Sequence, residues 1–420
     1  MAGNIPSGNT IQVEKTQMNT KFAFVAMTTL FFIWGFITAL NDILIPHLKA
    51  AFSLSYTEAM LVQFCFFGAY FIISPFAGKL IEKVGYQRGI IIGLLTIASG
   101  CLLFYPAAEV EVYAIFLLGL FILASGVTIL QVSANPYVAI LGSENTAASR
   151  LNLAQAINSL GHTLGPMFGA ALIFGTATTV IAATAVQLPY FILASVMILT
   201  ATIFWRIKLP VIKHIEDAHA AEVTTDSIFK HKPLLYGTLA IFLYVGAEVS
   251  IGSFLVNFFA ESHIGGLTEH EASKMVSYFW GAAMIGRFIG AALMRVIRPT
   301  YLLAGNSLMV ILLIILTINS QGSIAMWAII SVGLFNSIMF PTIFTLAIKG
   351  LGPLTGRGSG LLCQAIVGGA ILPMLQGIAA DMYSVQASFI VPAFAYIYIA
   401  WYALRGSKTV QDEQVIEVKA

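Results

Sequence analysis

The stretch FAFVAMTTLFFIWGFITALNDILIPHL, residues 22–48, contains 27 residues and one charged side chain, that of Asp42. A helix needs about 20 mostly apolar residues to cross the roughly 30 Å hydrocarbon core of a bilayer. The stretch is therefore long enough to span a membrane. Residues 1–20 are polar and lack the apolar region of a signal peptide, so we expect a retained helix rather than a cleaved leader.

Similar apolar stretches follow along the whole chain once it is divided at its charges and turn residues. With the first they make twelve predicted spans: 22–48, 58–80, 89–107, 111–141, 151–175, 187–205, 234–260, 271–296, 300–318, 323–348, 358–380 and 384–404. The composition agrees, since 58% of the residues are hydrophobic and 10% are charged, whereas a soluble domain has about 25% charged residues. We predict an all-α membrane protein with twelve transmembrane helices.

The basic residues predict the orientation of these spans, because cytoplasmic loops of membrane proteins are enriched in Lys and Arg. With the N-terminus placed inside, 18 of the 21 Lys and Arg residues fall on the cytoplasmic side. The exceptions are Lys49, Lys274 and Arg287, of which Arg287 lies within a span. Both termini are therefore expected in the cytoplasm, and the net charge of +2 gives no reason to expect nucleic acid as a partner.

A run of mixed charge near the middle of the chain predicts two pseudo-symmetric bundles of six helices. The expected parts are an N-terminal tail, a first bundle, a cytoplasmic linker, a second bundle and a C-terminal tail, at residues 1–20, 21–206, 207–233, 234–405 and 406–420. Four residue patterns recur in order at separations of 205 to 212 residues, which indicates an internal duplication. Transporters built from such repeats bind substrate between the repeats, near the middle of the membrane.

Two acidic residues, Asp42 and Glu248, lie within predicted spans, whereas the other 17 fall in tails, loops or helix ends. An ionisable side chain inside a bilayer costs several kcal/mol and therefore indicates a function. Glu248 is close to the middle of its span. Asp42 lies 21 residues beyond Lys21, about 31 Å at the helical rise, so an interfacial position for it stays open. Arg287 receives no role from the sequence.

Uncharged polar side chains form stripes on several spans and predict a polar cavity. These candidate ligands are Gln131 and Asn135 in the fourth span, Gln155, Asn158 and His162 in the fifth, and Gln364 in the eleventh. Amide groups both donate and accept hydrogen bonds, which suits the hydroxyl groups of a sugar. The alternative is hydrogen bonding between helices, and for His162 a proton relay and a packing role are equally open.

Asn257 is a further candidate ligand, provided that the seventh span is broken. It lies nine residues after Glu248, so the two face opposite sides of a straight helix. Gly246 and Gly252 flank Glu248 and would let the seventh span unwind. Asn257 is expected in the site only if that helix breaks.

The loop between the second and third spans reads GKLIEKVGYQR, residues 78–88, and resembles the G-x-x-x-D-R/K-x-G-R-R/K signature of the major facilitator superfamily. Glycines permit a tight turn there, and the acid is expected to latch the two halves on the cytoplasmic side. The residues expected to form this gate are Gly78, Glu82, Lys83, Gly85 and Arg88. Glu82 and Gln87 depart from the signature, so we expect a looser latch. A basic loop that only sets orientation is the alternative.

Five short segments resemble one family of that superfamily, the fucose–galactose–glucose:proton symporters, and within it the bacterial glucose/galactose permeases. The segments are FIWGF at 32–36, LND at 40–42, ANPY at 134–137, RLNLAQ at 150–155 and YVGAE at 244–248. The resemblance implies a twelve-helix bacterial inner-membrane importer of a monosaccharide, working by cation symport and alternating access. It also implies that Asp42 is the proton-linked aspartate, with Asn41 beside it in the sugar site.

One departure from the family changes the expected chemistry. Gln131 stands where the fucose permeases carry a glutamate, and a neutral amide cannot carry a proton, so Gln131 is expected to bind sugar. Our hypothesis is that Glu248 supplies the second coupling carboxylate from the other half. Sodium stays open as the coupled ion, because carboxylates and amides also ligate sodium.

Two rival functions remain at this stage. A multidrug or organic-solute exporter coupled to proton antiport would favour an apolar, aromatic cavity, and the amide stripes argue against it. A membrane enzyme would need catalytic groups, and the sequence shows no paired metal ligands, no nucleophile beside a base and no glycine-rich phosphate loop. We expect no catalytic site, cofactor or metal, and we expect a monomer in a lipid bilayer.

Overall fold

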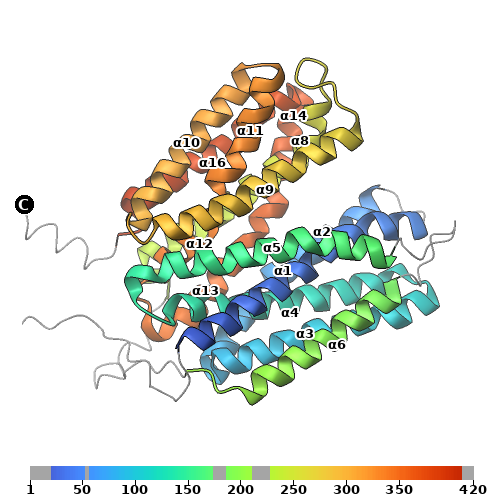
Figure 1. The fold of residues 1–420 in the computed structure, drawn as a ribbon, viewed down its shortest axis with the longest axis vertical. Helices are drawn as coiled ribbons and strands as arrows, with labels where there is room; N and C mark the ends of the chain where they lie inside the picture. Colours follow the sequence, from blue (N-terminus) through green and yellow to red (C-terminus); the bar gives the residue numbers. More distant parts are fainter. Residues whose placement is uncertain (1–19, 53–55, 174–185, 211–227, 409–420) are drawn as a thin grey trace, which may run out of the picture.

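The computed structural model describes residues 20–52, 56–173, 186–210 and 228–408, and for residues 40–51, 56–60, 63, 166–173 and 269–270 it describes the backbone alone. Every regular element in these residues is helical, which confirms the predicted fold class. The helices form two groups that approach each other at one end and diverge toward the other (Figure 1).

The first group is built from long helices of the N-terminal half. They are α1 (Thr20–Ala51), α2 (Tyr56–Val84), α3 (Tyr86–Val110), α4 (Tyr113–Ile140), α5 (Ala147–Ile173), preceded by η1 (Glu144–Thr146), and α6 (Gln187–Arg206). Helix α1 packs on α5, and α3 packs on both α4 and α6. A single residue, Gly85, separates α2 from α3, and its φ of 81° is a conformation that glycine adopts without a steric penalty.

The second group contains more and shorter elements. They are η3 (Ile228–Lys230), α8 (Lys232–Ala260), α9 (Glu269–Leu293), α10 (Pro299–Asn319), α11 (Gly322–Asn336), α12 (Met339–Ala347), η4 (Gly352–Leu354), α13 (Thr355–Gln364), η5 (Ala365–Val367), α14 (Gly368–Met382), α15 (Val385–Ser388), α16 (Ile390–Trp401) and η6 (Tyr402–Gly406). Helix α8 packs against α9, α12, α14 and α16 and so lies at the centre of this group.

Three predicted spans of the second half are interrupted rather than continuous. The tenth divides into α11 and α12, the eleventh into α13, η5 and α14, and the twelfth into α15 and α16. Pro341, near the start of α12, explains the first break, because proline has no backbone N–H to continue the ladder of a helix. At the second break, a Cβ on Gly368 would lie 2.0 Å from the carbonyl oxygen of Phe242, so α14 starts in direct backbone contact with α8.

The seventh span, α8, is continuous, so the condition under which Asn257 would join the site is not met. It runs as one helix from Lys232 to Ala260. Gly246 instead permits close packing, since a Cβ there would lie 2.7 Å from Cδ2 of Leu372 and 2.9 Å from the carbonyl oxygen of Gly368. Asn257 therefore stays on a different side of α8 from Glu248.

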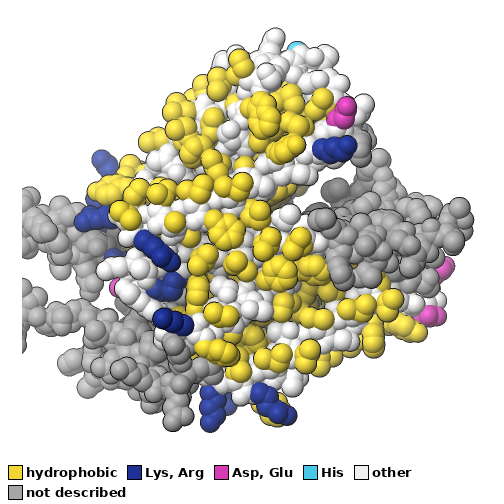
Figure 2. All heavy atoms as spheres, viewed as in Figure 1, with side chains coloured by type: hydrophobic (Ala, Val, Ile, Leu, Met, Phe, Trp, Pro, Cys, Tyr) yellow, Lys and Arg dark blue, Asp and Glu magenta, His cyan; other side chains and the backbone are white. Residues whose placement is uncertain are grey.

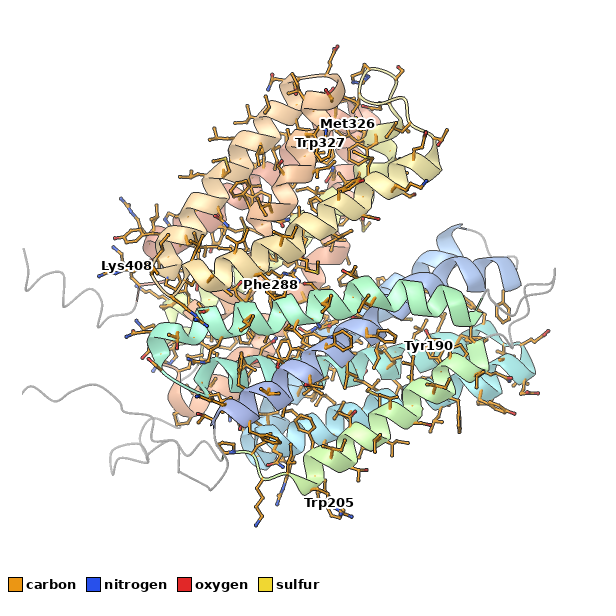
Figure 3. The ribbon with its side chains drawn as sticks, viewed as in Figure 1. Tyr190, Trp205, Phe288, Met326, Trp327 and Lys408 are labelled. Atoms are coloured by element: carbon orange, nitrogen blue, oxygen red, sulfur yellow. The ribbon has the colours of Figure 1, made fainter. Side chains whose placement is uncertain are left out.

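The surface of the described residues suits a bilayer. Eleven helical segments of the described part are long and apolar enough to cross a membrane, and α5, whose side chains are described through residue 165, is the remaining predicted span. Apolar side chains cover the flank of both groups (Figure 2). Trp205 and Trp327 project from α6 and α11 with 70% and 53% of their surface exposed (Figure 3).

The charged side chains gather at the ends of the helices. Lys and Arg lie mainly at the end where the two groups approach each other (Figure 2), which we call the basic end. Its members include Lys79, Lys83, Arg88, Arg206, Arg295, Arg298, Arg357 and Lys408. The end away from it is called the opposite end below.

Close packing of α3 on α4 yields a stability prediction. A Cβ at Gly100 would lie 2.5 Å from the backbone nitrogen of Leu123 and 2.8 Å from the carbonyl oxygen of Gly119. Gly100→Ala should therefore force the two helices apart at a cost of about 1–3 kcal/mol, and should lower the thermal unfolding temperature in detergent.

The matched control is Gly305→Ala in α10, where a Cβ would meet nothing within 4 Å. Alanine is favoured over glycine by about 1 kcal/mol in a helix interior, so this variant should unfold at the same or a higher temperature. Equal unfolding temperatures for the two variants would contradict the packing argument.

Candidate functional site

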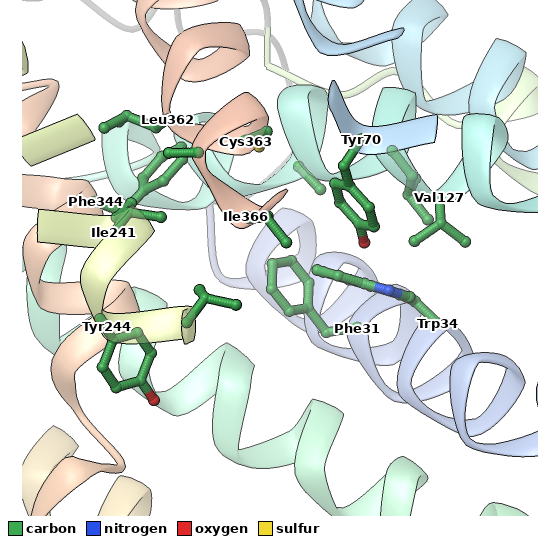
Figure 4. Close-up of a cluster of buried hydrophobic side chains, with 14 of the residues drawn as sticks. Phe31, Trp34, Tyr70, Val127, Ile241, Tyr244, Phe344, Leu362, Cys363 and Ile366 are labelled. Carbon is green, nitrogen blue, oxygen red and sulfur yellow. The ribbon is translucent and has the colours of Figure 1, made fainter. Parts of the chain in front are cut away.

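Aromatic side chains and one amide line the inner face of the first group. Phe31 and Trp34 of α1 lie with ring centroids 5.1 Å apart, and Tyr70 of α2 points toward them (Figure 4). Gln131 of α4 is buried, and its amide nitrogen donates a hydrogen bond to the hydroxyl oxygen of Tyr70. Ile366 of η5 approaches the same cluster from the second group (Figure 4).

Two predicted ligands, Asn135 and Gln155, meet on the same inner face of the first group. Nε2 of Gln155 lies 3.4 Å from Oδ1 of Asn135, so α4 and α5 each supply an amide. Both side chains are at least nine-tenths buried, and Nδ2 of Asn135 has no hydrogen-bond partner. A buried donor without a partner costs about 1–3 kcal/mol, so this atom suits a ligand hydroxyl.

The other polar residues of α5 are engaged by α1. Nδ2 of Asn158 donates to the carbonyl oxygen of Phe31 at 2.8 Å, and Nδ1 of His162 lies 3.3 Å from Oγ1 of Thr38. A Cβ at Gly35 would lie 2.1 Å from the carbonyl oxygen of Asn158. In this structure these contacts correspond to the helix-packing alternative, as α1 and α5 are in backbone contact.

Glu248 faces the first group from the middle of α8 and has partners that the sequence did not indicate. The Tyr244 hydroxyl donates to Oε1 of Glu248 at 2.8 Å, and Nη2 of Arg287, on α9, lies 3.7 Å from the same oxygen. The side chains of Glu248 and Arg287 are only 14% and 16% exposed. Arg287, which had no assigned role, is thus the counter-charge of Glu248.

Arg287 also connects the two groups of helices. Its Nη1 donates to the hydroxyl of Ser159 on α5, and its Nε donates to the carbonyl oxygen of Ser337 at 3.2 Å. That carbonyl is available because Pro341, four residues later, has no N–H to donate to it. A lone serine gives no signal in a sequence, so Ser159 could not have been found from spacing.

Prolines free two further carbonyls, and side chains from the second group bind both. Pro75 leaves the carbonyl of Phe71 without its helical donor, and Pro136 does the same for Val132. The donors are Nε2 of Gln364, 3.2 Å from the Phe71 oxygen, and Oγ of Ser359, 3.1 Å from the Val132 oxygen. The predicted ligand Gln364 is therefore engaged between the halves in this structure.

An ion pair closes the basic end. Oε2 of Glu82, in α2, lies 2.7 Å from Nε of Arg357, in α13. The backbones approach closely here, since a Cβ at Gly78 would lie 2.9 Å from the carbonyl oxygen of Gly356. Lys83 and Arg88 are exposed at the same end.

Gln87, which departs from the signature, caps α6 instead of contributing charge. Its Nε2 donates to the carbonyl oxygens of Phe204 and Ile207 at 2.7 and 2.6 Å, and its Oε1 accepts from the backbone nitrogen of Leu209. The Tyr137 hydroxyl binds the carbonyl of Pro210, the next residue. These contacts hold the chain after α6 against the first group.

Asn41 and Asp42 lie in α1, but their side chains are outside the described residues, so the structure gives no contact for either. Among the described side chains, the structure brings together Gln131, Asn135 and Gln155 on the first group and places Glu248 across from them. It does not bring Asn257 to Glu248, because α8 is unbroken.

Comparisons with known proteins agree with this geometry. Residues 23–365 match the family model described as Major Facilitator Superfamily. The chain is 54% identical to the glucose/galactose transporter of Brucella abortus, over 97% of this chain and all of the relative. It is 33% identical to the L-fucose-proton symporter of Escherichia coli, over 92% of this chain and 93% of the relative.

A solved structure is also similar along nearly the whole chain. It is the crystal structure of a Major Facilitator Superfamily transporter, FucP, in the outward conformation, with a TM-score of 0.85 and 33% identity. The match covers 93% of this chain and all of the other.

The buried contact between Gln131 and Tyr70 yields a prediction. Tyr70→Phe removes the oxygen that accepts the hydrogen bond of the Gln131 amide, so thermal unfolding in detergent should show a loss of about 1–3 kcal/mol. Adding Gln131→Leu to Tyr70→Phe removes both partners and should recover much of that loss. Additive effects of the two substitutions would contradict a direct bond.

Proposed function

The chain belongs to the Major Facilitator Superfamily, and we propose that it imports a hexose in symport with protons by alternating access. The observation that carries this proposal is the 54% identity to a glucose/galactose transporter over 97% of the chain. The similarity to an L-fucose-proton symporter supports protons as the coupled ion. Bacterial relatives favour the inner membrane, and the alternative function of an exporter finds no support among them.

The basic end is the cytoplasmic end in this proposal, because Lys and Arg collect on the cytoplasmic side of membrane proteins. At that end Glu82 is paired with Arg357, and the helix pairs α2–α13 and α5–α9 are in contact. The structure then corresponds to the outward-facing state. One chain supplies both groups of helices, so we place the whole path in a monomer.

The sugar site lies between the two groups, with the first group as its main wall. Asn135 offers an unpartnered amide donor, and Gln131 and Gln155 add amides that donate and accept. Trp34 gives an apolar ring for the carbon face of a pyranose. Asn158, His162 and Gln364 are already bonded to helix partners or neighbours, and they reach the sugar only if those contacts exchange.

Asp42 and Glu248 are the coupling carboxylates in this proposal. Burial away from water favours the neutral form of a carboxyl group in general, so a group alternately exposed to the two sides can load and release a proton. A membrane potential adds about 2.3 kcal/mol per charge per 100 mV, which favours inward movement of a positively charged load. Sodium is the alternative coupled ion, and the uptake experiment described next distinguishes it from protons.

Uptake into proteoliposomes tests the function directly. Purified protein should concentrate labelled glucose, galactose or fucose when an inward proton gradient is imposed, and a protonophore should abolish the accumulation. A sodium gradient without a proton gradient should give no accumulation. Accumulation driven by sodium alone would overturn proton coupling, and no hexose uptake under either gradient would overturn the proposed function.

Asp42→Asn separates coupling from sugar binding. The amide keeps the size of the side chain but cannot carry a proton, so concentrative uptake should be lost while sugar counterflow continues. Both rates can be measured in the same vesicles. Unimpaired concentrative uptake by Asp42→Asn would show that Asp42 is not the coupling acid.

A further inference from the structure

Arg287 touches three structural elements at once, with a different nitrogen for each. Its Nη2 lies 3.7 Å from Oε1 of Glu248, its Nε binds the carbonyl of Ser337, and its Nη1 binds the Ser159 hydroxyl. The first two partners belong to the second group of helices, whereas Ser159 belongs to the first. The guanidinium is therefore a link between the halves, tied to the charge of one carboxylate.

The geometry requires an arginine. A guanidinium presents its N–H donors in a rigid planar fork, whereas a lysine ammonium is a single point on a flexible stem. One lysine nitrogen cannot occupy the three separate positions that Nε, Nη1 and Nη2 take here. The Ser159 hydroxyl accepts from Arg287 and donates its one hydrogen to the carbonyl oxygen of Gln155 at 2.9 Å.

We propose that Arg287 transmits the protonation of Glu248 to the contact between the halves. With Glu248 ionised, Arg287 is held in place against Ser159 and the basic end stays closed. With Glu248 protonated, the basic end opens. The inference rests on the proposed symport, and it makes Arg287 a positioning residue for the coupled movement.

Protonation of Glu248 favours opening, rather than closing, of the basic end because an enclosed charge without a partner is costly. Removing one partner of a buried ion pair leaves the other charge uncompensated and is strongly unfavourable. Once Glu248 is neutral, Arg287 keeps only uncharged acceptors at an interface from which water is largely excluded. Separation of α5 from α9 hydrates the guanidinium and relieves that cost, at the expense of the Ser159 bond. Proton loading from the opposite end thus favours opening at the basic end.

Other groups face Glu248 and have to be separated from Arg287 in any test. Tyr244 donates to it from α8, the imidazole of His162 on α5 is near enough to interact electrostatically, and the Tyr396 hydroxyl of α16 is also nearby. Histidine is a side chain type that can change its charge between pH 5 and 8. A pH effect on the closure is therefore assigned to the Glu248–Arg287 pair only when it persists after His162 is replaced.

Pulsed electron paramagnetic resonance measures the closure directly. Spin labels are attached at Lys208→Cys and Arg298→Cys, which are exposed at the basic end of the first and second groups. The half-buried Cys65 is replaced by serine, whereas Cys101 and Cys363 are buried and can stay. Distances are recorded in lipid nanodiscs between pH 5 and 8 without sugar. Acidification should increase the population with the longer distance.

The variants divide the proposal into its parts. Glu248→Gln should show the longer distance at every pH. Ser159→Ala leaves the Glu248–Arg287 pair in place and should lower the ratio of closed to open molecules by about tenfold at pH 8, because a hydrogen bond to a charged group is lost. Arg287→Lys cannot make the three contacts at once, so it should also raise the population with the longer distance at pH 8. His162→Gln should keep the pH dependence.

Thr200→Ala is the matched control, since Thr200 is a buried hydroxyl residue of the first group that bonds the carbonyl of Val196 in its own helix. It should not move the populations. The proposal is overturned by a Glu248→Gln protein that stays closed, by a Ser159→Ala protein with unchanged populations, or by loss of the pH dependence in His162→Gln. These distances need no sugar, so failure of hexose uptake in the parent protein would overturn the proposed function separately.

Discussion

Backbone carbonyls inside a membrane cannot bind water, so each needs a donor from the protein. Most find it within their own helix, but a proline removes the donor four residues after a carbonyl. Three carbonyls freed in this way receive side-chain donors instead, and two of these donors cross between the halves. The three donor–acceptor pairs are Gln364 with Phe71, Ser359 with Val132, and Arg287 with Ser337. Contacts between the halves therefore form at the backbone carbonyls that prolines leave without a donor in their own helix.

The charge chemistry of the site is divided unequally between the halves. On the first group, Gln131 and Tyr70 form a neutral buried pair. On the second group, Glu248 and Arg287 form an ion pair that is mostly enclosed. Among the described side chains the first group therefore supplies mainly neutral donors and acceptors for a ligand. The second group supplies the enclosed charge pair among these described side chains.

The sequence could predict whatever depends on spacing along one helix. The apolar spans, the fold class and the polar stripes on α4 and α5 all follow from apolar length and from which residues share a helix face. Pro341 is visible in the sequence at the break between α11 and α12, but a proline within a span can either kink a helix or break it. The contact of Gly246 with α14 could not be predicted, because it depends on which helix lies alongside. The partners of Glu248 could not be predicted for the same reason. Arg287 was conspicuous as an intramembrane charge, but nothing in its position specified α8 as its neighbour.

The contacts of Gln87 and Tyr137 shorten the tether between the two halves. They fix the chain to the first group through Pro210, and η3 begins the second group at Ile228. The 17 residues between them have a contour length of at most about 60 Å, at roughly 3.3–3.6 Å per residue. The contacts between the halves that the structure describes lie on helix faces instead, as where α2 meets α13 and α5 meets α9.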